Sequence, residues 1–457
     1  MEQVEKRRMS NQMPMNRDAR ICIVGAGAAG IAAAQTLRRL GYRRITILEQ
    51  RDRVGGKCWT VIENDRPLDL AATYVPPNYT TVRRFAQQAG VRLRLAAPFE
   101  HLGLDGRRRP YGRPPKPYPL IPRIAEFLRL GLELNKARTL FDVSVGEADL
   151  ALVRRWAIPY AQWVKEGHWD YFHQVAYPLL RSWGFGYEEY DVPALYTLQA
   201  LPYFAPGGNI LRLWDLSRVP LYHIEEGYGE LWRRLAEPFD VRLNTTIRRI
   251  ERSEDGGVIH TDQESVEFDW LILACPLKKA LAFLDASEEE DELFSALRQL
   301  EVWQALVPVD GLPDALILDS TQTYDQAGRT LGFFRQRPDT KWCYFFGYTR
   351  PDLSDEATRA GIERDIQSLG GTLLGPMRFT RWDYFPHYAS QQLAAGYHAR
   401  QYYLQGKRNT LYVGESVTPF GVEMVAQHAV RIIHQHFDEA KDATIPAMAD
   451  ELSAIAT

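Results

Sequence analysis

One glycine-rich turn constrains the fold of this chain more than any other feature. Gly25-Ala-Gly27-Ala-Ala-Gly30 has the spacing G-x-G-x-x-G, follows an apolar run at 20–24 and precedes a helix expected over 31–40. The first glycine permits a tight turn, the second lets backbone approach a pyrophosphate, and the third permits close helix–strand packing. A helix that begins here offers unpaired N–H groups and its positive dipole end to phosphates. The turn therefore predicts a strand–turn–helix unit that binds a dinucleotide.

An acidic residue at the end of the next expected strand narrows the choice of dinucleotide. The run 45–49 reads as a second buried strand, and Glu49 follows Gly30 at about the 20-residue distance from which a carboxylate binds ribose hydroxyls. An acid at this place disfavours the 2′-phosphate of NADP. An unrelated α/β domain is disfavoured as well, because the strand, the helix and the acid all occur where a dinucleotide requires them.

The segment after the second strand distinguishes FAD from NAD. Arg51-Asp-Arg-Val-Gly-Gly56-Lys57 places two glycines and a basic residue just beyond that strand. A second close backbone approach and a cation suit a longer cofactor whose flavin lies past the first turn. Here the chain resembles the flavin-containing amine oxidoreductases, the superfamily of monoamine oxidases, polyamine oxidases and phytoene desaturases. Their pattern is GxGxxG, an acid, and then RxGG[RK].

The resemblance extends over most of the chain. Asp69-Leu-Ala-Ala-Thr-Tyr74 is similar to the family's flavin-facing DLGGxY segment, with alanines where glycines are usual. The segments 227–229 and 271–276 are similar to returning parts of the FAD domain, and 411–415 to the C-terminal segment whose acid meets the ribityl chain. The resemblance implies these cofactor-binding residues: Gly25, Gly27, Ala29, Gly30, Glu49, Gln50, Arg51, Gly56, Lys57, Ala72, Thr73, Tyr74, Ile247, Ala274, Gly414, Glu415, Glu423 and Met424.

These observations predict an α/β fold with two parts. The first is a Rossmann-type FAD-binding domain assembled from the discontinuous segments 20–93, 220–285 and 401–457. The second is an α+β substrate-binding domain built from 94–219 and 286–400, with an aromatic-rich helical part over 120–215. Residues 1–19 are expected to form a flexible tail. The Arg- and Pro-rich stretch 94–119 is expected to be a connecting excursion rather than a core element.

Charge and composition argue against other classes of partner. The 55 basic and 58 acidic residues give a net charge of −3, which provides no field suited to nucleic acid or an anionic membrane surface. We therefore expect a lipophilic small molecule as the partner, and the oligomeric state stays open. No segment has the pattern of a signal peptide or a transmembrane anchor, so a cytoplasmic location is expected. Glu166, His168, Asp170 and His173 lack a recognised ligand spacing, so no metal site is predicted.

The four cysteines bear on how the flavin is attached. Cys22, Cys58, Cys275 and Cys343 lack CxxC or metal-type spacing and read as free thiols of a reducing compartment. Monoamine oxidases tether their flavin through a cysteine shortly before the C-terminal Gly-Glu motif, and no cysteine follows Cys343 here. The resemblance therefore implies non-covalent FAD. Cys58 follows Lys57 directly, and a small packed residue is its expected role.

Within the superfamily, several segments are most similar to the bacterial polyenoic fatty acid double-bond isomerases. They are 54–58, 185–187 with 192–194, 384–387, 395–396 and 405–410. The resemblance implies that oxidised flavin accepts hydride from a bis-allylic carbon and returns it at another position of the pentadienyl system. The protein would supply an apolar tunnel, aromatic walls and exclusion of water. The implied catalytic residues are Tyr74, Phe185, Tyr187, Tyr384, His387 and Phe420.

Other functions remain open. An amine oxidase needs two aromatic residues beside the flavin, and the segment after Glu415 offers only Phe420. A desaturase or dehydrogenase with external reoxidation shares the first half-reaction. A non-enzymatic flavin-binding regulator is disfavoured by the large aromatic-rich region. A fatty carboxylate would also need a basic partner, for which the candidates are Arg94, Arg107, Arg108, Arg109 and Arg113.

Overall fold

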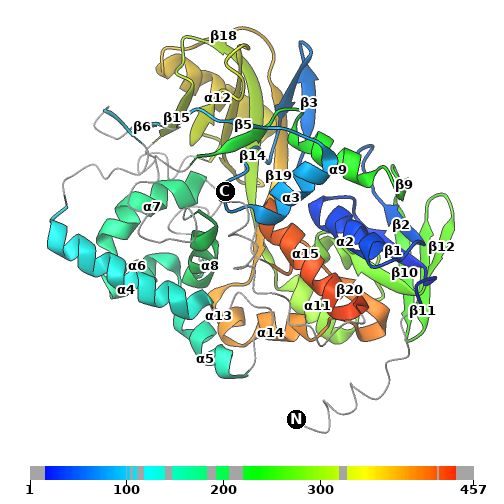
Figure 1. Ribbon diagram of the computed structural model, residues 1–457. Coiled ribbons are helices and arrows are strands. Elements are labelled where there is room, and N and C mark those ends of the chain that lie inside the picture. The colour runs from blue at the N-terminus through cyan, green and yellow to red at the C-terminus, as the bar shows by residue number, and fades with distance from the viewer. Residues whose placement is uncertain are drawn as a thin grey trace, which may run out of the picture.

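A parallel sheet of five strands forms the base of the cofactor-binding part in this computed structural model (Figure 1). The structure describes residues 16–98, 100–102, 107–110, 118–138, 147–182, 192–204, 220–318, 327–418 and 421–438. The strands, in spatial order, are β20 (Thr410–Tyr412), β13 (Trp270–Leu273), β1 (Ile21–Val24), β2 (Ile45–Leu48) and β9 (Asp240–Arg242). All their pairings are parallel. The sheet thus brings together strands far apart in the sequence, which confirms the predicted α/β fold.

Helices cover this sheet and bury its apolar side chains. Helix α2 (Ala28–Arg39) packs against α15 (Val422–Phe437), and the two lie side by side in Figure 1. Every residue of α2 from Ala28 to Leu37 is buried, and its alanines allow this close packing. Helices α3 (Thr80–Ala89) and α9 (Tyr228–Ala236) pack against each other beside them.

The glycine turn is shorter than expected. Helix α2 begins at Ala28, so the turn occupies only 25–27, whereas we expected the helix to begin at Ile31. Gly30 is therefore helical, and a Cβ on it would lie 2.0 Å from the carbonyl oxygen of Gly25. The third glycine is required because the first turn of the helix packs directly onto the preceding loop.

A second, larger sheet has eight strands. Its order is β18 (Thr372–Leu373), β14 (Arg298–Asp310), β17 (Trp342–Thr349), β16 (Gly332–Phe334), β15 (Ala315–Leu318), β6 (Glu100–Leu102) and β7 (Arg108–Pro110), with β19 (Arg378–His387) also pairing with β14. Helix α12 (Asp355–Ser368) packs against β18.

The expectation that 94–119 only connects other elements was wrong. Strand β6 pairs in parallel with β15 and antiparallel with β7, and β5 (Leu93–Leu95) pairs with β8 (Tyr222–Ile224). These strands are only three residues long, too short to show a readable alternation of apolar residues, and β5 and β7 also carry arginine or proline. The expected domain boundary at 93/94 falls inside β5, and the domain limits remain predictions.

The described residues between 120 and 204 are mostly helical, as expected, while the rest of the predicted helical part 120–215 lies outside the described residues. It contains α4 (Leu120–Arg138), α5 (Glu147–Trp156), α6 (Tyr160–Gly167), α7 (Asp170–Ser182) and α8 (Ala194–Phe204). Its aromatic residues pack on one another: Trp163 stacks on Trp169 with ring centroids 5.1 Å apart, and Trp156 is fully buried. These described aromatics therefore form a helical core. Among the described residues, no helix combines the length and apolar character needed to span a bilayer.

Shorter elements complete the described chain. Strands β10 (Ile247–Ser253), β11 (Gly256–Thr261) and β12 (Ser265–Phe268) form an antiparallel sheet, and a hairpin turn near Asp255 joins the first two. The remaining elements are β3 (Thr60–Glu63), β4 (Arg66–Asp69), α10 (Leu277–Ala280), α11 (Glu288–Ser295), α13 (Ser390–Ala394), α14 (Tyr397–Tyr402) and the 3₁₀ turn η4 (Lys407–Asn409).

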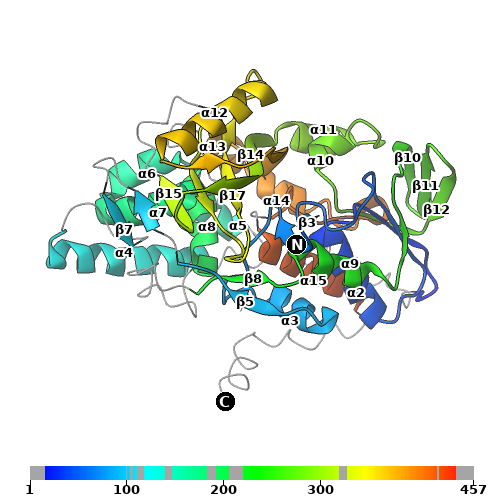
Figure 2. The ribbon, with the colours of Figure 1, turned by 90° about the horizontal axis from the view of Figure 1, so that it is seen from above.

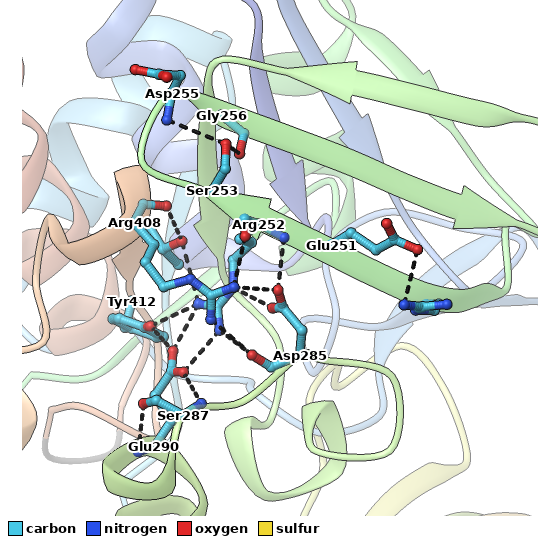
Figure 3. Close-up of polar contacts among 12 residues, drawn as sticks. Glu251, Arg252, Ser253, Asp255, Gly256, Asp285, Ser287, Glu290, Arg408 and Tyr412 are labelled. Atoms are coloured by element: carbon cyan, nitrogen blue, oxygen red, sulfur yellow. Dashed lines mark hydrogen bonds and ion pairs between the residues drawn. The ribbon is translucent and has the colours of Figure 1, made fainter.

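A buried charge network ties β20 to its neighbours (Figure 3). The Arg252 guanidinium, fully buried, donates to Asp285 and to Glu290, each at 2.7 Å. The hydroxyl of Tyr412 on β20 donates to Glu290, and Arg408 donates to Asp285. Burial alone would raise the pKa of Glu290, but the Arg252 hydrogen bond and charge outweigh it and lower that pKa to about 2. The network therefore joins β10 and α11 to the strand that ends just before Gly414.

Replacing Arg252 by leucine should destabilise the protein strongly. The Arg252→Leu substitution leaves Glu290 buried without its cation, and breaking such a pair costs about 3–5 kcal/mol of unfolding free energy. The Arg252→Leu/Glu290→Leu double variant should recover part of that loss. Because the folded pKa of Glu290 is lowered, its contribution is full above its ordinary pKa and is lost as the pH falls toward 2. Urea unfolding at pH 7 and pH 3 measures both effects, and a loss below about 1 kcal/mol at pH 7 would contradict this role.

Candidate cofactor and substrate site

Two glycine loops meet backbone to backbone at the carboxyl end of β1. Gly27 bridges Gly55, and the N–H of Gly55 donates to the carbonyl of Ala26 at 2.8 Å. A Cβ placed on Gly56 would lie 3.1 Å from the Cα of Gly27. A side chain on either loop at this contact would push the two loops apart. The contact therefore explains why both motifs have glycine at these positions.

The turns after β13 and β20 reach the same place. Gly25 has a φ of +106°, and a Cβ on it would lie 2.8 Å from the carbonyl oxygen of Ala274. A Cβ on Gly414, whose φ is +102°, would lie 3.6 Å from the Cβ of Ala29 and 3.9 Å from that same carbonyl oxygen. Predicted cofactor residues from three distant segments thus converge at the carboxyl ends of parallel strands, where ligands bind in such sheets.

Glu49 holds the first loop and keeps acceptor capacity for a ligand. Its two carboxylate oxygens accept the backbone N–H groups of Ala26 at 2.8 Å and Arg51 at 2.9 Å. Each oxygen has a second acceptor position, which suits ribose hydroxyls. The side chains of Gln50 and Arg51, also predicted to bind the cofactor, are exposed, and the Arg51 guanidinium lies 4.6 Å over the Trp382 ring.

Arg53 is a residue that the sequence reasoning missed. Its Nη1 donates to the carbonyl of Gly56 at 2.9 Å, while its Nη2 is buried without a hydrogen-bond partner among the described residues. Burial and the neighbouring Arg51 lower the pKa of Arg53 to about 10. A partly buried guanidinium with a buried, unused N–H beside the glycine contact fits an anionic group such as a pyrophosphate. The RxGG motif itself begins at Arg53 and could have indicated it.

Lys57, Glu415 and Tyr384 come together from three separate segments. Nζ of Lys57 lies 2.5 Å from a carboxylate oxygen of Glu415 and 5.2 Å over the Tyr384 ring. Burial and the charge of Glu415 raise the pKa of Tyr384 well above its usual range, so its hydroxyl is neutral. His387 is the last residue of the same strand, β19, and its ring stacks on Phe385 with centroids 4.8 Å apart.

The segment predicted to face the flavin is covered by aromatic rings. Five residues form this Tyr74 aromatic group: Tyr74, His223, Phe334, Tyr344 and Phe346. The Tyr74 ring lies 4.7 Å from His223 and 4.8 Å from Phe334, and Tyr344 donates its hydroxyl to the carbonyl of Ala71 at 3.0 Å. Burial, with a smaller effect of nearby Arg94, lowers the pKa of His223 to about 4, so the group carries no charge at pH 7.

A buried carboxyl group anchors the start of this segment. Oδ1 of Asp69 accepts the Thr60 hydroxyl at 2.6 Å and the N–H of Tyr228 at 2.8 Å. The Asp69 backbone exchanges two hydrogen bonds with the Gln336 side chain. Burial raises the pKa of Asp69 to about 7 against these hydrogen bonds. The adjoining backbone is also held to the glycine loop, since the N–H of Ala72 donates to the carbonyl of Lys57 at 3.1 Å.

Other predicted residues have different surroundings. Both Glu423 oxygens accept N–H groups at the start of α3, from Thr81 and Val82 at 2.8 Å each, so this side chain caps a helix, and its role in cofactor binding stays a prediction. Met424 is buried beside it in α15, Ile247 starts β10, and the Thr73 carbonyl accepts from His223. Phe185, Tyr187 and Phe420 lie outside the described residues.

The remaining candidates are engaged or lie elsewhere. Arg94 pairs with Glu225 at 2.9 Å, which weakens the prediction that it binds a substrate carboxylate. The other predicted carboxylate partners, Arg107, Arg108 and Arg109, lie at or beside β7. Arg113 lies outside the described residues. All four cysteines are free thiols, and burial raises the pKa of Cys58 far above its usual range. Across the described ranges, no three His, Cys, Asp or Glu side chains are grouped to hold a metal ion.

Comparison with known proteins settles the family. The model of the flavin containing amine oxidoreductases matches residues 28–431, most of the chain. The chain belongs to this family. Its cofactor is therefore FAD, and the free cysteines are consistent with non-covalent binding. The residues at the convergent glycine loops fit that group, since they combine two close backbone approaches, a ribose acceptor and a partly buried cation with a buried, unused N–H.

Relatives and solved structures extend the comparison. The chain is 26% identical to putrescine oxidase of Kocuria rosea over 267 residues (55% of this chain, 53% of that protein) and 25% identical to beta-cyclopiazonate dehydrogenase of Aspergillus flavus over 423 (86% and 88%). It spans about half the length of the amine and polyamine oxidases it matches.

Two solved structures share the fold over nearly the whole chain. A CLA-producing fatty acid isomerase from P. acnes has a TM-score of 0.79 at 22% identity, covering 93% of this chain and 100% of that one. Cyclohexylamine oxidase from Brevibacterium oxydans has a TM-score of 0.68 at 17% identity, covering 92% and 100%.

Replacing Glu49 by glutamine should weaken FAD binding. The amide keeps one acceptor oxygen for the loop but loses the charge, and hydrogen bonds to a charged group contribute about 1.5–3 kcal/mol. The dissociation constant for FAD, measured by flavin fluorescence on reconstituting the apoprotein, should rise roughly tenfold to a hundredfold. Asp255→Asn, at an exposed turn of the β10–β11 hairpin, is the control and should leave the flavin affinity unchanged. Equal flavin affinity in Glu49→Gln and wild type would contradict the assignment of Glu49.

Replacing Asp69 by asparagine should change how stability depends on pH. Because the folded pKa is raised from 3.8 to about 7, ionisation of Asp69 costs the wild type stability as the pH rises through that window. Asparagine keeps the accepting oxygen without ionising. Relative to wild type, the unfolding free energy of Asp69→Asn should therefore improve by a few kcal/mol between pH 4 and pH 8.

Urea denaturation at both pH values measures this difference. The control is Asp255→Asn at an exposed turn, for which the difference from wild type should be the same at both pH values. A constant difference for Asp69→Asn would show that the buried carboxyl does not titrate in this range.

Proposed function

We propose that this chain is an FAD-dependent enzyme that abstracts hydride from an unsaturated lipophilic substrate, and that it acts as a double-bond isomerase on polyunsaturated fatty acids of the linoleate type. The observation that carries the proposal is the uncharged Tyr74 aromatic group, which covers the segment expected to face the flavin. A higher TM-score to the CLA-producing isomerase than to cyclohexylamine oxidase supports the same choice.

The proposed chemistry assigns simple tasks to the residues of this chain. When bound, FAD supplies an oxidised flavin that takes up hydride from a weak bis-allylic C–H and can give it back. Arg53 and the loops at Gly27 and Gly56 hold the pyrophosphate, and Glu49 accepts the ribose hydroxyls. Lys57 neutralises Glu415, so that no unpaired carboxylate borders the ring system.

The aromatic group favours a delocalised cation over a localised charge. Ring faces attract cationic carbon, and the effect grows when water is excluded. His223 stays neutral at pH 7 because its pKa is lowered to about 4, so it adds no opposing positive charge. Tyr384 likewise keeps its proton. The described residues of this group provide no ionised acid or base, and internal return of hydride requires none.

Amine oxidation is the second candidate, and the family and its relatives favour it. Putrescine oxidase is among the relatives, and an aromatic group also accommodates a neutral amine. Dehydrogenation with external reoxidation is a third candidate, and beta-cyclopiazonate dehydrogenase is among the relatives. These alternatives differ from isomerisation in requiring an electron acceptor at every turnover.

Anaerobic mixing of the yellow holoprotein with linoleic acid separates the candidates. Growth of a conjugated-diene band near about 234 nm over many turnovers, with the flavin band near about 450 nm largely retained, would support the isomerase. No diene with linoleic acid, but bleaching by putrescine or cyclohexylamine and recovery in air, would overturn it in favour of an amine oxidase. Bleaching by linoleic acid with a single turnover would indicate a dehydrogenase.

Replacing Phe334 by leucine should slow turnover without releasing FAD. The Phe334→Leu substitution keeps an apolar side chain but removes a ring face, and cation–π contacts contribute about 0.5–2 kcal/mol. We expect kcat for diene formation to fall roughly threefold to thirtyfold, with unchanged flavin content. Phe333→Leu, in the neighbouring core, is the matched control, because its ring stacks on Phe345 rather than on Tyr74. Equal losses in the two variants would remove the support for a ring-face role.

A further inference from the structure

Helix α4 exposes an apolar face. Five large apolar side chains of this helix have exposed fractions between 43% and 81%: Leu120, Ile121, Ile124, Leu128 and Leu132. Three of them, Ile124, Leu128 and Leu132, are spaced four residues apart and therefore lie on one face of the helix. Single exposed apolar residues are ordinary on protein surfaces, but a contiguous row of this size is associated with an interaction.

The acidic residues of the same helix point inward. Glu126 accepts the N–H groups of Phe172 at 2.6 Å and Tyr171 at 3.2 Å, at the start of α7. Glu133 accepts from Arg155 at 2.7 Å and from the indole of Trp156 at 3.0 Å. Both glutamates are buried. The polar side of α4 thus faces the protein and its apolar side faces outward, the reverse of an ordinary surface helix.

The charges left at the outer side of α4 are basic. Arg129 and Lys136 are exposed, while both glutamates of the helix are buried. Lys136 also pairs with Glu133 at 3.5 Å, and Arg123, which lies over the Tyr171 ring of α7 at 5.7 Å, belongs to the inner side of the helix. Arg129 also donates to the carbonyls of Gly167 and His168 and lies 4.6 Å over the Trp169 ring, which fixes its guanidinium next to the end of α6. An apolar row bordered by cations is complementary to a layer of acyl chains beneath anionic headgroups.

The position of α4 leaves this face accessible to a flat surface. In both ribbon views the helix runs along the outer edge of the helical region (Figures 1 and 2). Helices α7 and α8 pack on its inner side, and its buried Glu133 and exposed Arg129 bond to α5 and to the end of α6. The helix lacks the apolar character needed to span a bilayer, so a position parallel to the membrane plane is the geometry that buries its row.

We propose that the outer face of α4 docks the protein onto the surface of an anionic phospholipid bilayer. The net charge of −3 sums all charges of the chain and does not report the local charge of this face, where the two glutamates of α4 are turned inward. The sequence-based expectation that the chain has no field for an anionic membrane surface therefore does not apply to this helix. The proposal rests on exposure and charge alone, so it can fail or hold independently of the substrate.

Vesicle co-sedimentation of the full-length holoprotein tests the proposal. The probes are vesicles of phosphatidylcholine with an equal part of phosphatidylglycerol, and vesicles of phosphatidylcholine alone, each at low and at high salt. We expect binding to the anionic vesicles that weakens with salt. The Ile121→Asp/Leu128→Asp double variant should bind more than tenfold less tightly, because it removes apolar area and adds like charge to the headgroups. Ile121→Gln/Leu128→Gln, without added charge, should show a smaller loss.

Controls separate the face of α4 from general surface changes. Leu374→Asp changes a comparably exposed leucine on another part of the molecule and should leave vesicle binding intact. Flavin content and circular dichroism check that each variant is folded. Equal binding by wild type and the aspartate double variant, or no binding by wild type, would overturn the proposal.

Two further outcomes would assign the face to another occupant and also overturn the proposal. If the double variant turns a dimer into a monomer in analytical ultracentrifugation while vesicles never bind, the face contacts a second copy of the chain. If vesicles bind only after removal of 439–457, that segment occupies the face in the full-length protein.

Discussion

The direct contact between the loops at Gly27 and Gly55–Gly56 is the constraint on which the site depends. Because neither loop carries a Cβ at the contact, the segments after β1 and β2 approach closely enough to share a hydrogen bond. The turns after β13 and β20 close on the same point through Gly25 and Gly414. The glycines are therefore the clearest sequence signal of the cofactor site, because they allow these loops to approach one another closely.

Buried charge is used in two different ways in this molecule. Arg252, Glu290 and Asp285 satisfy one another and hold β20 in place, so their role is structural. Arg53, in contrast, keeps a buried N–H without a partner among the described residues. A satisfied network holds strands together, whereas an unsatisfied donor beside a glycine contact indicates where an anion binds.

Local chemistry explains what could be predicted from sequence. The strand at 21–24, the helix after it and the acid at Glu49 follow from glycine spacing and chain order, which act over a few residues. The strands at 100–102 and 108–110 could not be predicted, because they are stabilised by pairing with residues far along the chain. The helix cap made by Glu423 and the outward apolar face of α4 depend likewise on which neighbours each helix meets. The identities of Phe185, Tyr187 and Phe420 as site residues remain predictions.

Tracing deuterium from linoleic acid labelled at its bis-allylic carbon tests the central claim most directly. If the aromatic site returns the abstracted hydride to the same substrate molecule, the conjugated product formed without oxygen should carry the label at a new carbon, even in ordinary water. Mass spectrometry and NMR of the product would locate it. Loss of the label to solvent, or a product two hydrogens poorer than the substrate, would contradict internal return and leave an oxidase or dehydrogenase.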